Sequence, residues 1–397
     1  MSDRPGKWFE PDLARSALHV TRREFLERTC ACAGMATLVA TGLPAAAGAL
    51  GNGPWSDDEH EILGIREASW YEKLDEKRVE CKLCPRGCVV DDFERGYCGV
   101  RENRGGTYYT LVYGRPCSLH VDPVEKKPLF HFLPGKQAFS IATAGCNIEC
   151  LFCQNWQISQ TRPEDLRSIE LPPARLAREA ERASAPIIAY TYSEPVVFSE
   201  YMRDCAIEGH KRGIRSVMIS NGYIQPGALR DLCRVLDAVK IDLKAYQDGF
   251  YRDMCDGELE PVLKTLEILK EQGIWFEIVY LIIPTLNDKM EEIRRMSEWI
   301  RDSLGPHVPL HFSRFHPTYK MQNLPRTPVS TLENARSTAM EAGLQFVYLG
   351  NVVGHEGEST YCPSCGERVI HRIGYQIVEN LVDGGACSCG ELIPGVW

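Results

Sequence analysis

The sequence lacks any run of lysine and arginine long enough to follow a phosphate backbone, and its net charge is −9, from 45 basic and 54 acidic residues. Both features argue against a general nucleic-acid binder. The chain also lacks an apolar stretch of the length that a membrane-spanning helix needs, which predicts no membrane span. Its 17 cysteines in 397 residues are too sparse for a small disulfide-stapled protein. The length of 397 residues predicts two to three domains, and 44% apolar residues are enough for a substantial core.

The first part of the chain has the layout of a twin-arginine export signal. The pair Arg22-Arg23 stands in TRREFL, a weakly apolar run follows over 29–43, and AAAGA at 45–49 offers a cleavage site. An ordinary amphipathic helix with a chance arginine pair is the alternative. We therefore predict a signal over 1–49 and a protein exported by this route or tethered to the membrane, with a cytoplasmic location as the alternative.

The rest of the chain divides into three parts by its patterning. An amphipathic pattern predicts a helix over 56–77, leading into a cysteine-rich segment that ends at 135. From 136 to 350, short apolar runs alternate with helical patterns, which predicts an α/β fold with parallel strands. Residues 355–397 carry two cysteine pairs and many glycines, and we expect a small zinc-ribbon-like appendage there.

Six such apolar runs predict that the core is a partial (β/α)6 TIM-like barrel. The expected strands cover 139–144, 187–192, 216–220, 238–243, 275–283 and 310–315. The expected helices include 173–183, 226–236, 259–272 and 290–304.

Polar residues that do not suit a core follow each predicted strand directly. In a parallel barrel the carboxyl ends of the strands converge on one mouth, where such barrels place their chemistry. Taken singly, each of these residues could be a surface pair or a turn residue. Together they predict one site, and they are Ser193, Glu194, Asn221, Asp242, Lys244, Asn287, Asp288 and His316.

Three cysteines, Cys146, Cys150 and Cys153, follow the first predicted strand in a CxxxCxxC spacing. Three thiolates on one loop suit an iron–sulfur cluster that needs four ligands, so that one iron is left open for chemistry. A structural zinc ion would need a fourth protein ligand nearby, and no cysteine follows within twenty residues. The motif therefore favours a catalytic cluster.

This loop resembles that of the radical S-adenosylmethionine (SAM) superfamily, and the chain is closest in pattern to its pyruvate formate-lyase activating enzyme-like branch and to the AmmeMemoRadiSam-system enzymes. The resemblance covers about 70–397. The strings that carry it are LCPR (83–86), DPVEKKPLFHF (122–132), TAGCN (143–147), CQNW (153–156), YTYSEP (190–195), SNG (220–222), IDLK (241–244), RFHP (314–317) and IPGVW (393–397).

The resemblance implies a role for each matching residue. Cys146, Cys150 and Cys153 are implied to hold a [4Fe–4S] cluster whose open iron binds SAM. Ser193 and Glu194 stand where the superfamily has Gly-Gly-Glu-Pro, whose edge meets the SAM amino group, with Tyr192 and Ser193 replacing the glycines. The other implied SAM contacts are Phe152 near the adenine, Asn221 at the ribose, Asp242 and Lys244 at the amino-acid end, and His316 near the carboxylate or ribose.

The implied reaction is reductive cleavage of SAM to a 5′-deoxyadenosyl radical, which abstracts hydrogen from an unidentified substrate, a protein among the candidates. Glycyl-radical activation is one reaction of this kind. The resemblance further implies an electron donor such as flavodoxin or ferredoxin, and association with Memo-like and AMMECR1-like proteins. The alternative is a non-catalytic iron–sulfur protein for electron transfer or metal handling.

Two further cysteine sets have the spacing of metal ligands. Cys81, Cys84, Cys88 and Cys98 could hold either zinc or an auxiliary iron–sulfur cluster, and the spacing leaves both open. Cys362, Cys365, Cys387 and Cys389 favour structural zinc, although the second pair is CxC. Burial as a small apolar side chain is the default for the other cysteines outside the signal, with Cys255 the one candidate for a radical relay.

Overall fold

The computed structural model describes residues 64–397, so the predicted signal over 1–49 lies outside the described residues. Within 64–397 no helix is long and apolar enough to cross a membrane. This finding contradicts the expectation of an exported or membrane-tethered protein.

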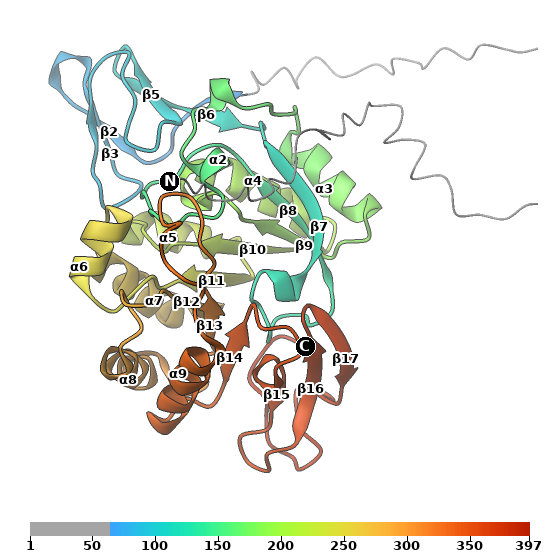
Figure 1. Ribbon diagram of the computed structural model, residues 1–397. Helices are drawn as coiled ribbons and strands as arrows, with labels where there is room; N and C mark the ends of the chain where they lie inside the picture. The colour runs from blue at the N-terminus through green and yellow to red at the C-terminus, as the bar shows by residue number, and fades with distance from the viewer. Residues whose placement is uncertain (1–63) are drawn as a thin grey trace, which may run out of the picture. The chain divides into compact units, whose positions relative to one another are not determined.

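The main sheet has eight strands in the order β14-β13-β12-β11-β10-β9-β8-β7 (Figure 1). Strands β8 to β14 are parallel to their neighbours, and β7 pairs antiparallel with β8. The strands are β7 (Ser118–Pro123), β8 (Gln137–Ala142), β9 (Ile187–Tyr190), β10 (Arg215–Ser220), β11 (Ala238–Asp242), β12 (Trp275–Ile282), β13 (Leu310–Arg314) and β14 (Val347–Gly350). The six expected strands are β8 to β13, and the structure adds one strand at each edge.

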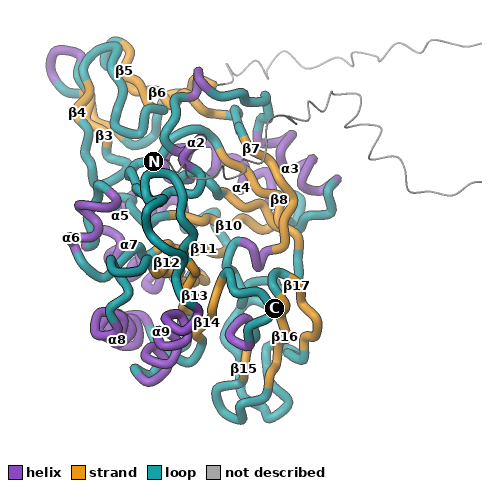
Figure 2. The backbone as a smooth tube through the Cα atoms, in the orientation of Figure 1, coloured by secondary structure: helices purple, strands orange, loops and turns teal. Residues whose placement is uncertain are grey.

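Helices follow most of the parallel strands, as the alternating pattern predicts. Longer ones are α3 (Pro173–Arg182), α4 (Ser199–His210), α7 (Glu260–Gln272), α8 (Met290–Trp299) and α9 (Val329–Glu341), and shorter ones are α2 (Trp156–Ser159), α5 (Pro226–Leu232) and α6 (Asp248–Phe250). In Figure 2, α7, α8 and α9 lie along one side of the strands. The central strands read as continuous apolar runs because both faces of a parallel sheet are covered, and all four residues of β9 are buried.

The cysteine-rich segment consists of two small antiparallel sheets, with orders β1-β6-β5 and β2-β3-β4. Their strands are β1 (Gly64–Glu67), β2 (Tyr71–Lys73), β3 (Val79–Cys81), β4 (Val89–Val90), β5 (Arg101–Arg104) and β6 (Thr107–Tyr113). The helix predicted over 56–77 is therefore wrong from residue 64 onward. Strand β1 pairs with β6, more than forty residues later, and such a distant partner overrides the local helical pattern.

The last segment forms a third small sheet of β15 (Thr360–Tyr361), β16 (Arg368–Ile373) and β17 (Gln376–Asn380). It packs on the loop between β7 and β8. The Arg372 guanidinium donates a hydrogen bond to the carbonyl of Phe130 over 2.8 Å, and Val396 forms a parallel bridge with Phe132. The chain end is thereby attached to the edge of the main sheet.

Candidate active site

The loop with Cys146, Cys150 and Cys153 leaves the end of β8 and leads into α2. Cys150 is buried and the other two thiols are half-buried. Backbone hydrogen bonds hold this loop against the π-helical turn over Tyr251–Cys255: Glu149 N–H donates to the Cys255 carbonyl (2.8 Å) and Leu151 N–H to the Met254 carbonyl (2.9 Å). The loop that carries the three sulfurs is therefore held in place by backbone hydrogen bonds.

Gly145 allows this loop to pass close to the cysteine-rich segment. Its φ is +97°, and a Cβ at this position would lie 2.6 Å from Cγ1 of Val100 and 2.8 Å from the Cys98 carbonyl oxygen. A side chain here meets both backbone strain and a clash. The residue before the first cysteine of the motif must therefore be glycine.

The three thiols have different electrostatic environments. Burial raises the pKa of Cys146 and of Cys153 above the ordinary range. A hydrogen bond from the Cys255 thiol lowers the pKa of Cys150, and the positive charge of Lys244 lowers it further against the effect of burial. The structure thus places Cys255, a buried cysteine outside the motif, beside the predicted triplet.

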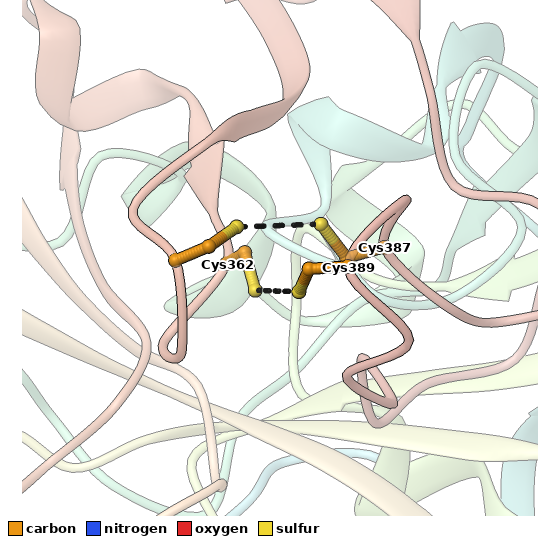
Figure 3. Close-up of side chains that lie close together, drawn as sticks. Cys362, Cys387 and Cys389 are labelled. Atoms are coloured by element: carbon orange, nitrogen blue, oxygen red, sulfur yellow. Dashed lines mark hydrogen bonds between the residues drawn. The ribbon is translucent and has the colours of Figure 1, made fainter.

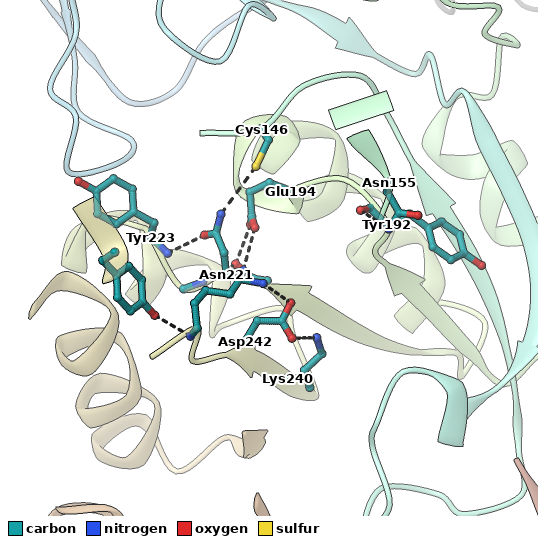
Figure 4. Close-up of polar contacts among 12 residues, drawn as sticks. Cys146, Asn155, Tyr192, Glu194, Asn221, Tyr223, Lys240 and Asp242 are labelled. Carbon is teal, nitrogen blue, oxygen red and sulfur yellow. Dashed lines mark hydrogen bonds and ion pairs between the residues drawn. The ribbon is translucent and has the colours of Figure 1, made fainter. Parts of the chain in front are cut away.

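A network of hydrogen bonds links the cysteine loop to the ends of β9 and β10 (Figure 4). The Asn221 amide lies 3.8 Å from the Cys146 sulfur and donates to the Asn147 side chain over 2.9 Å. Asn221 N–H donates to the Glu194 carboxylate at 2.8 Å, and the Ser220 hydroxyl donates to the same group at 2.6 Å. Burial raises the pKa of Glu194 to about 7, although these hydrogen bonds oppose the rise.

Tyr192 and Ser193, which replace the superfamily's glycines, have distinct conformations. Tyr192 has a φ of +67°, a left-handed conformation that favours glycine, and its side chain is held by Asp122 and by Lys127. Its carbonyl accepts a 2.9 Å hydrogen bond from Asn155 (Figure 4). The buried Ser193 hydroxyl has no hydrogen-bond partner within the described part of the chain, so it is available to a ligand.

At the end of β11 a carboxylate lies between two lysines (Figure 4). Lys244 pairs with Asp242 at 3.0 Å, and Lys240 pairs with the other oxygen of the same carboxylate. Although burial opposes it, the two lysines lower the pKa of Asp242 to about 2. The sequence prediction missed Lys240, although its spacing of two residues from Asp242 places both on one face of the strand. The group carries a net positive charge of one.

The remaining predicted site residues do not all belong to this hydrogen-bonded network. Phe152 is buried, and its ring packs against Phe250 at 5.8 Å between centroids. The buried amide of Asn287 donates to the Lys244 carbonyl at 2.9 Å and so fixes the loop after β12. His316 is exposed and takes no part in the network described above, while Asp288 is half-buried.

The second cysteine-rich site lies in the last segment, where the sulfurs of Cys362, Cys365, Cys387 and Cys389 all lie within 4.8 Å of one another. The Cys362 and Cys389 sulfurs are 3.6 Å apart and those of Cys365 and Cys387 are 3.7 Å apart (Figure 3). Four thiolates at 2.3 Å around one tetrahedral zinc ion are separated by about 3.8 Å. These residues could therefore hold a single metal ion.

Comparison with known proteins agrees with this site. The family described as the radical SAM superfamily matches residues 140–297, which contain the cysteine loop and the ends of β9 to β11. The chain belongs to this superfamily. It is 47% identical to an uncharacterized protein of Methanocaldococcus jannaschii, over 83% of this chain and 99% of that protein.

The chain is also homologous to pyruvate formate-lyase activating enzymes. It is 24% identical to the pyruvate formate-lyase 1-activating enzyme of Escherichia coli K12, over 40% of this chain and 66% of that enzyme. A solved radical SAM methyltransferase from Sphaerobacter thermophilus aligns with 75% of this chain and 81% of its own, at 14% identity and a TM-score of 0.44. Radical SAM proteins use a [4Fe–4S] cluster and SAM, and these are the cofactors of this chain.

Proposed function

We propose that Cys146, Cys150 and Cys153 hold the [4Fe–4S] cluster of a radical SAM enzyme that abstracts hydrogen from its substrate. The observation that carries the proposal is the hydrogen-bonded network that joins the cysteine loop, through Asn221, to the strand ends of the main sheet. We interpret this sheet as a partial (β/α) barrel with its site at the carboxyl ends of the strands.

The residues around the loop fit the amino-acid end of SAM, which carries a carboxylate and an ammonium group. The pair of lysines around Asp242 leaves one positive charge uncompensated, which suits the carboxylate. The unpartnered Ser193 hydroxyl and the Glu194 carboxylate suit the ammonium group. When bound, the cluster and SAM supply the one-electron chemistry that breaks the sulfonium bond.

The substrate assignment rests on the activating enzymes. Because the chain is similar to the pyruvate formate-lyase 1-activating enzyme, we propose a protein substrate, with a glycine as the site of hydrogen abstraction. Flavodoxin or ferredoxin as the electron donor, and Memo-like and AMMECR1-like proteins as partners, remain predictions. The implied contacts of Phe152 and His316 with SAM also remain predictions.

The proposal is tested by the release of 5′-deoxyadenosine from SAM. Anaerobically reconstituted, dithionite-reduced full-length protein should form this nucleoside, and Cys146→Ala should reduce its yield to that of a reaction without protein, because the cluster loses a ligand. Cys233→Ala is the matched control, since Cys233 belongs to none of the three cysteine sets. A wild-type yield no higher than that of Cys146→Ala, in protein with its full iron content, would contradict the proposal and favour an electron-transfer protein.

A further inference from the structure

Four cysteines of the segment before the main sheet converge on one cavity. Cys81 ends β3, Cys84 and Cys88 lie in the turn between β3 and β4, and Cys98 lies in the turn before β5. All four line one pocket, together with Arg101 and Tyr108. The end of β3 and two turns from different sheets thus present four thiols to the same pocket.

The spacing of these sulfurs differs from that of the last cysteine set. In the described part of the chain, the set at 362–389 is the one group of cysteines whose sulfurs lie within 4.8 Å of one another. A mononuclear site brings its thiolates together around one ion, whereas a cubane cluster binds each thiolate at a different iron and so keeps them further apart. The first set surrounds a cavity, as a cubane requires.

Two buried polar groups at this cavity lack a protein partner. Nη1 of Arg101 and the hydroxyl of Tyr108 are buried without a hydrogen-bond partner among residues 64–397, and both residues line the cavity. The other guanidinium nitrogens of Arg101 are occupied, since Nη2 pairs with Glu200 at 2.5 Å and Nε donates to the Val197 carbonyl at 3.3 Å. Buried donors are almost always paired in folded proteins, so two unpaired donors at one pocket point to a ligand there.

The chemistry of these two donors fits an anionic ligand that is rich in sulfur. A cubane with four thiolates carries negative charge, and its inorganic sulfides accept hydrogen bonds. Arg101 supplies a buried positive charge and a free N–H, and Tyr108 supplies a free O–H. Four thiolates around a zinc ion would also accept these hydrogen bonds, so the wider separation of the sulfurs is what favours a cubane over zinc.

The backbone also keeps this space open. A Cβ on Gly96 would lie 2.4 Å from the Tyr108 hydroxyl oxygen and 3.8 Å from the Cys88 sulfur. Glycine at this position therefore lets the turn approach without filling the cavity. Asn147, which follows Cys146 directly in the chain, lines the same cavity, so this cavity lies beside the predicted catalytic loop.

We propose that Cys81, Cys84, Cys88 and Cys98 bind a second iron–sulfur cluster of the [4Fe–4S] type, with Arg101 and Tyr108 donating hydrogen bonds to it. This proposal is independent of the proposed catalysis, since it rests on residues outside the CxxxCxxC motif. For the last cysteine set, the sequence prediction of one structural zinc ion is kept.

The test is the metal content of full-length protein in which the catalytic triplet is removed. Cys146→Ala/Cys150→Ala/Cys153→Ala protein, reconstituted anaerobically with iron and sulfide, should retain about four irons and four sulfides per chain. It should also contain about one zinc ion. The complementary variant Cys84→Ala/Cys88→Ala should lose one cluster and keep the iron of the triplet. Cys233→Ala should match the wild type.

A triple variant that holds about two zinc ions and no acid-labile sulfide, or that holds no metal beyond a single zinc ion, would overturn the proposal. Neither result affects the proposed function if the wild type still forms 5′-deoxyadenosine. In the reverse case, iron in the triple variant together with no nucleoside from the wild type, the second cluster stands and the proposed function fails.

A single substitution that leaves these four cysteines in place separates an effect on the cluster from misfolding. Tyr108→Phe removes a hydroxyl that bonds to no protein group among residues 64–397, so the fold should be retained. In the background without the triplet, the electron paramagnetic resonance spectrum of the reduced cluster should shift, because one hydrogen bond to a cluster sulfur is lost. A spectrum identical to that of the unmodified background would contradict a cluster in this cavity.

Discussion

The Glu194 carboxylate holds together the backbone segments that follow β9 and β10, next to the cysteine loop. Its two oxygens accept hydrogen bonds from Asn221 N–H, from the Ser220 hydroxyl and from Val196 N–H. Through Asn221, whose side chain approaches the Cys146 sulfur, the carboxylate also sets the position of the catalytic loop. A single buried acid therefore connects two strand ends to the predicted cluster ligands.

Glu194→Gln should destabilise the protein by about 1–3 kcal/mol, because the amide NH₂ would face backbone and hydroxyl donors. Urea unfolding followed by circular dichroism measures the difference. Glu291→Gln is the control, since Glu291 is an exposed carboxylate on α8. Equal unfolding midpoints for Glu194→Gln and the control would show that the three hydrogen bonds contribute nothing net.

Single residues at the site differ in how far they can be predicted from sequence. Glu194 and Asn221 directly follow apolar runs, and the structure brings both into one network. Lys240 could have been identified from its spacing to Asp242, but it stands inside an apolar run, where a lysine looks like an isolated exception. Tyrosine rarely adopts a left-handed φ, so the one sequence signal for this conformation at Tyr192 is the glycine that the superfamily has at this position.

At the scale of elements, the cysteine loop depends on the two segments that brace it. The turn over Tyr251–Cys255 supplies backbone acceptors on one side, and the turn that contains Cys98 contacts Gly145 on the other. Neither contact is local in sequence. Hydrophobic periodicity predicts the strands that carry the loop, but not which distant turns will lie against it.

Gly145→Ala should destabilise the fold by about 2–4 kcal/mol, because a left-handed backbone and a clash with Val100 act together. It should also lower the iron content of the triplet, since the loop must move. Gly213→Ala is a matched control: Gly213 has a φ of +70° but a Cβ there would meet nothing within 4 Å, so it isolates the backbone contribution of about 1–2 kcal/mol. Equal losses of stability in the two variants would refute the clash.

Element patterns also explain the main success and the main error of the sequence prediction. Strands β8 to β13 were predictable because each is a short apolar run followed by a helix. Strand β14 is four residues long, as β9 is, but no α-helix follows it over residues 351–397, so its apolar run is ambiguous by itself. The error over 56–77 arose because β1 pairs with the distant strand β6 and β2 pairs with the neighbouring strand β3, and the helical pattern shows neither pairing.

At the scale of the whole molecule, a buried polar cluster joins the main sheet to the last segment. The His131 ring donates from Nδ1 to the Pro394 carbonyl at 2.6 Å and accepts from the Tyr348 hydroxyl at 2.5 Å through Nε2. Nearby, Glu277 accepts a hydrogen bond from His131 N–H and pairs with His311 at 2.7 Å. These contacts connect β12, β13 and β14 with the chain end.

This cluster makes stability depend on pH, because the geometry at His131 requires a neutral imidazole. Burial lowers the pKa of His131 to about 4, against an ordinary value of 6.5. The unfolded state therefore binds the proton more readily, so this stabilisation is fully present above pH 6.5 and is lost as the pH falls through about 4. The difference corresponds to about 3 kcal/mol.

His131→Gln should reduce the pH dependence of the free energy of unfolding between pH 6.5 and 4, because glutamine does not titrate, while the buried His311 keeps its own contribution. Urea unfolding at a series of pH values measures the slope. His120→Gln, at an exposed histidine on β7, should retain the wild-type slope. The slope, and not the absolute stability, is the decisive quantity, since His131→Gln also alters packing beside Trp397. An unchanged slope would mean that His131 binds a proton equally well in the folded and unfolded chains, and that its neutral imidazole does not attach the last segment to the sheet.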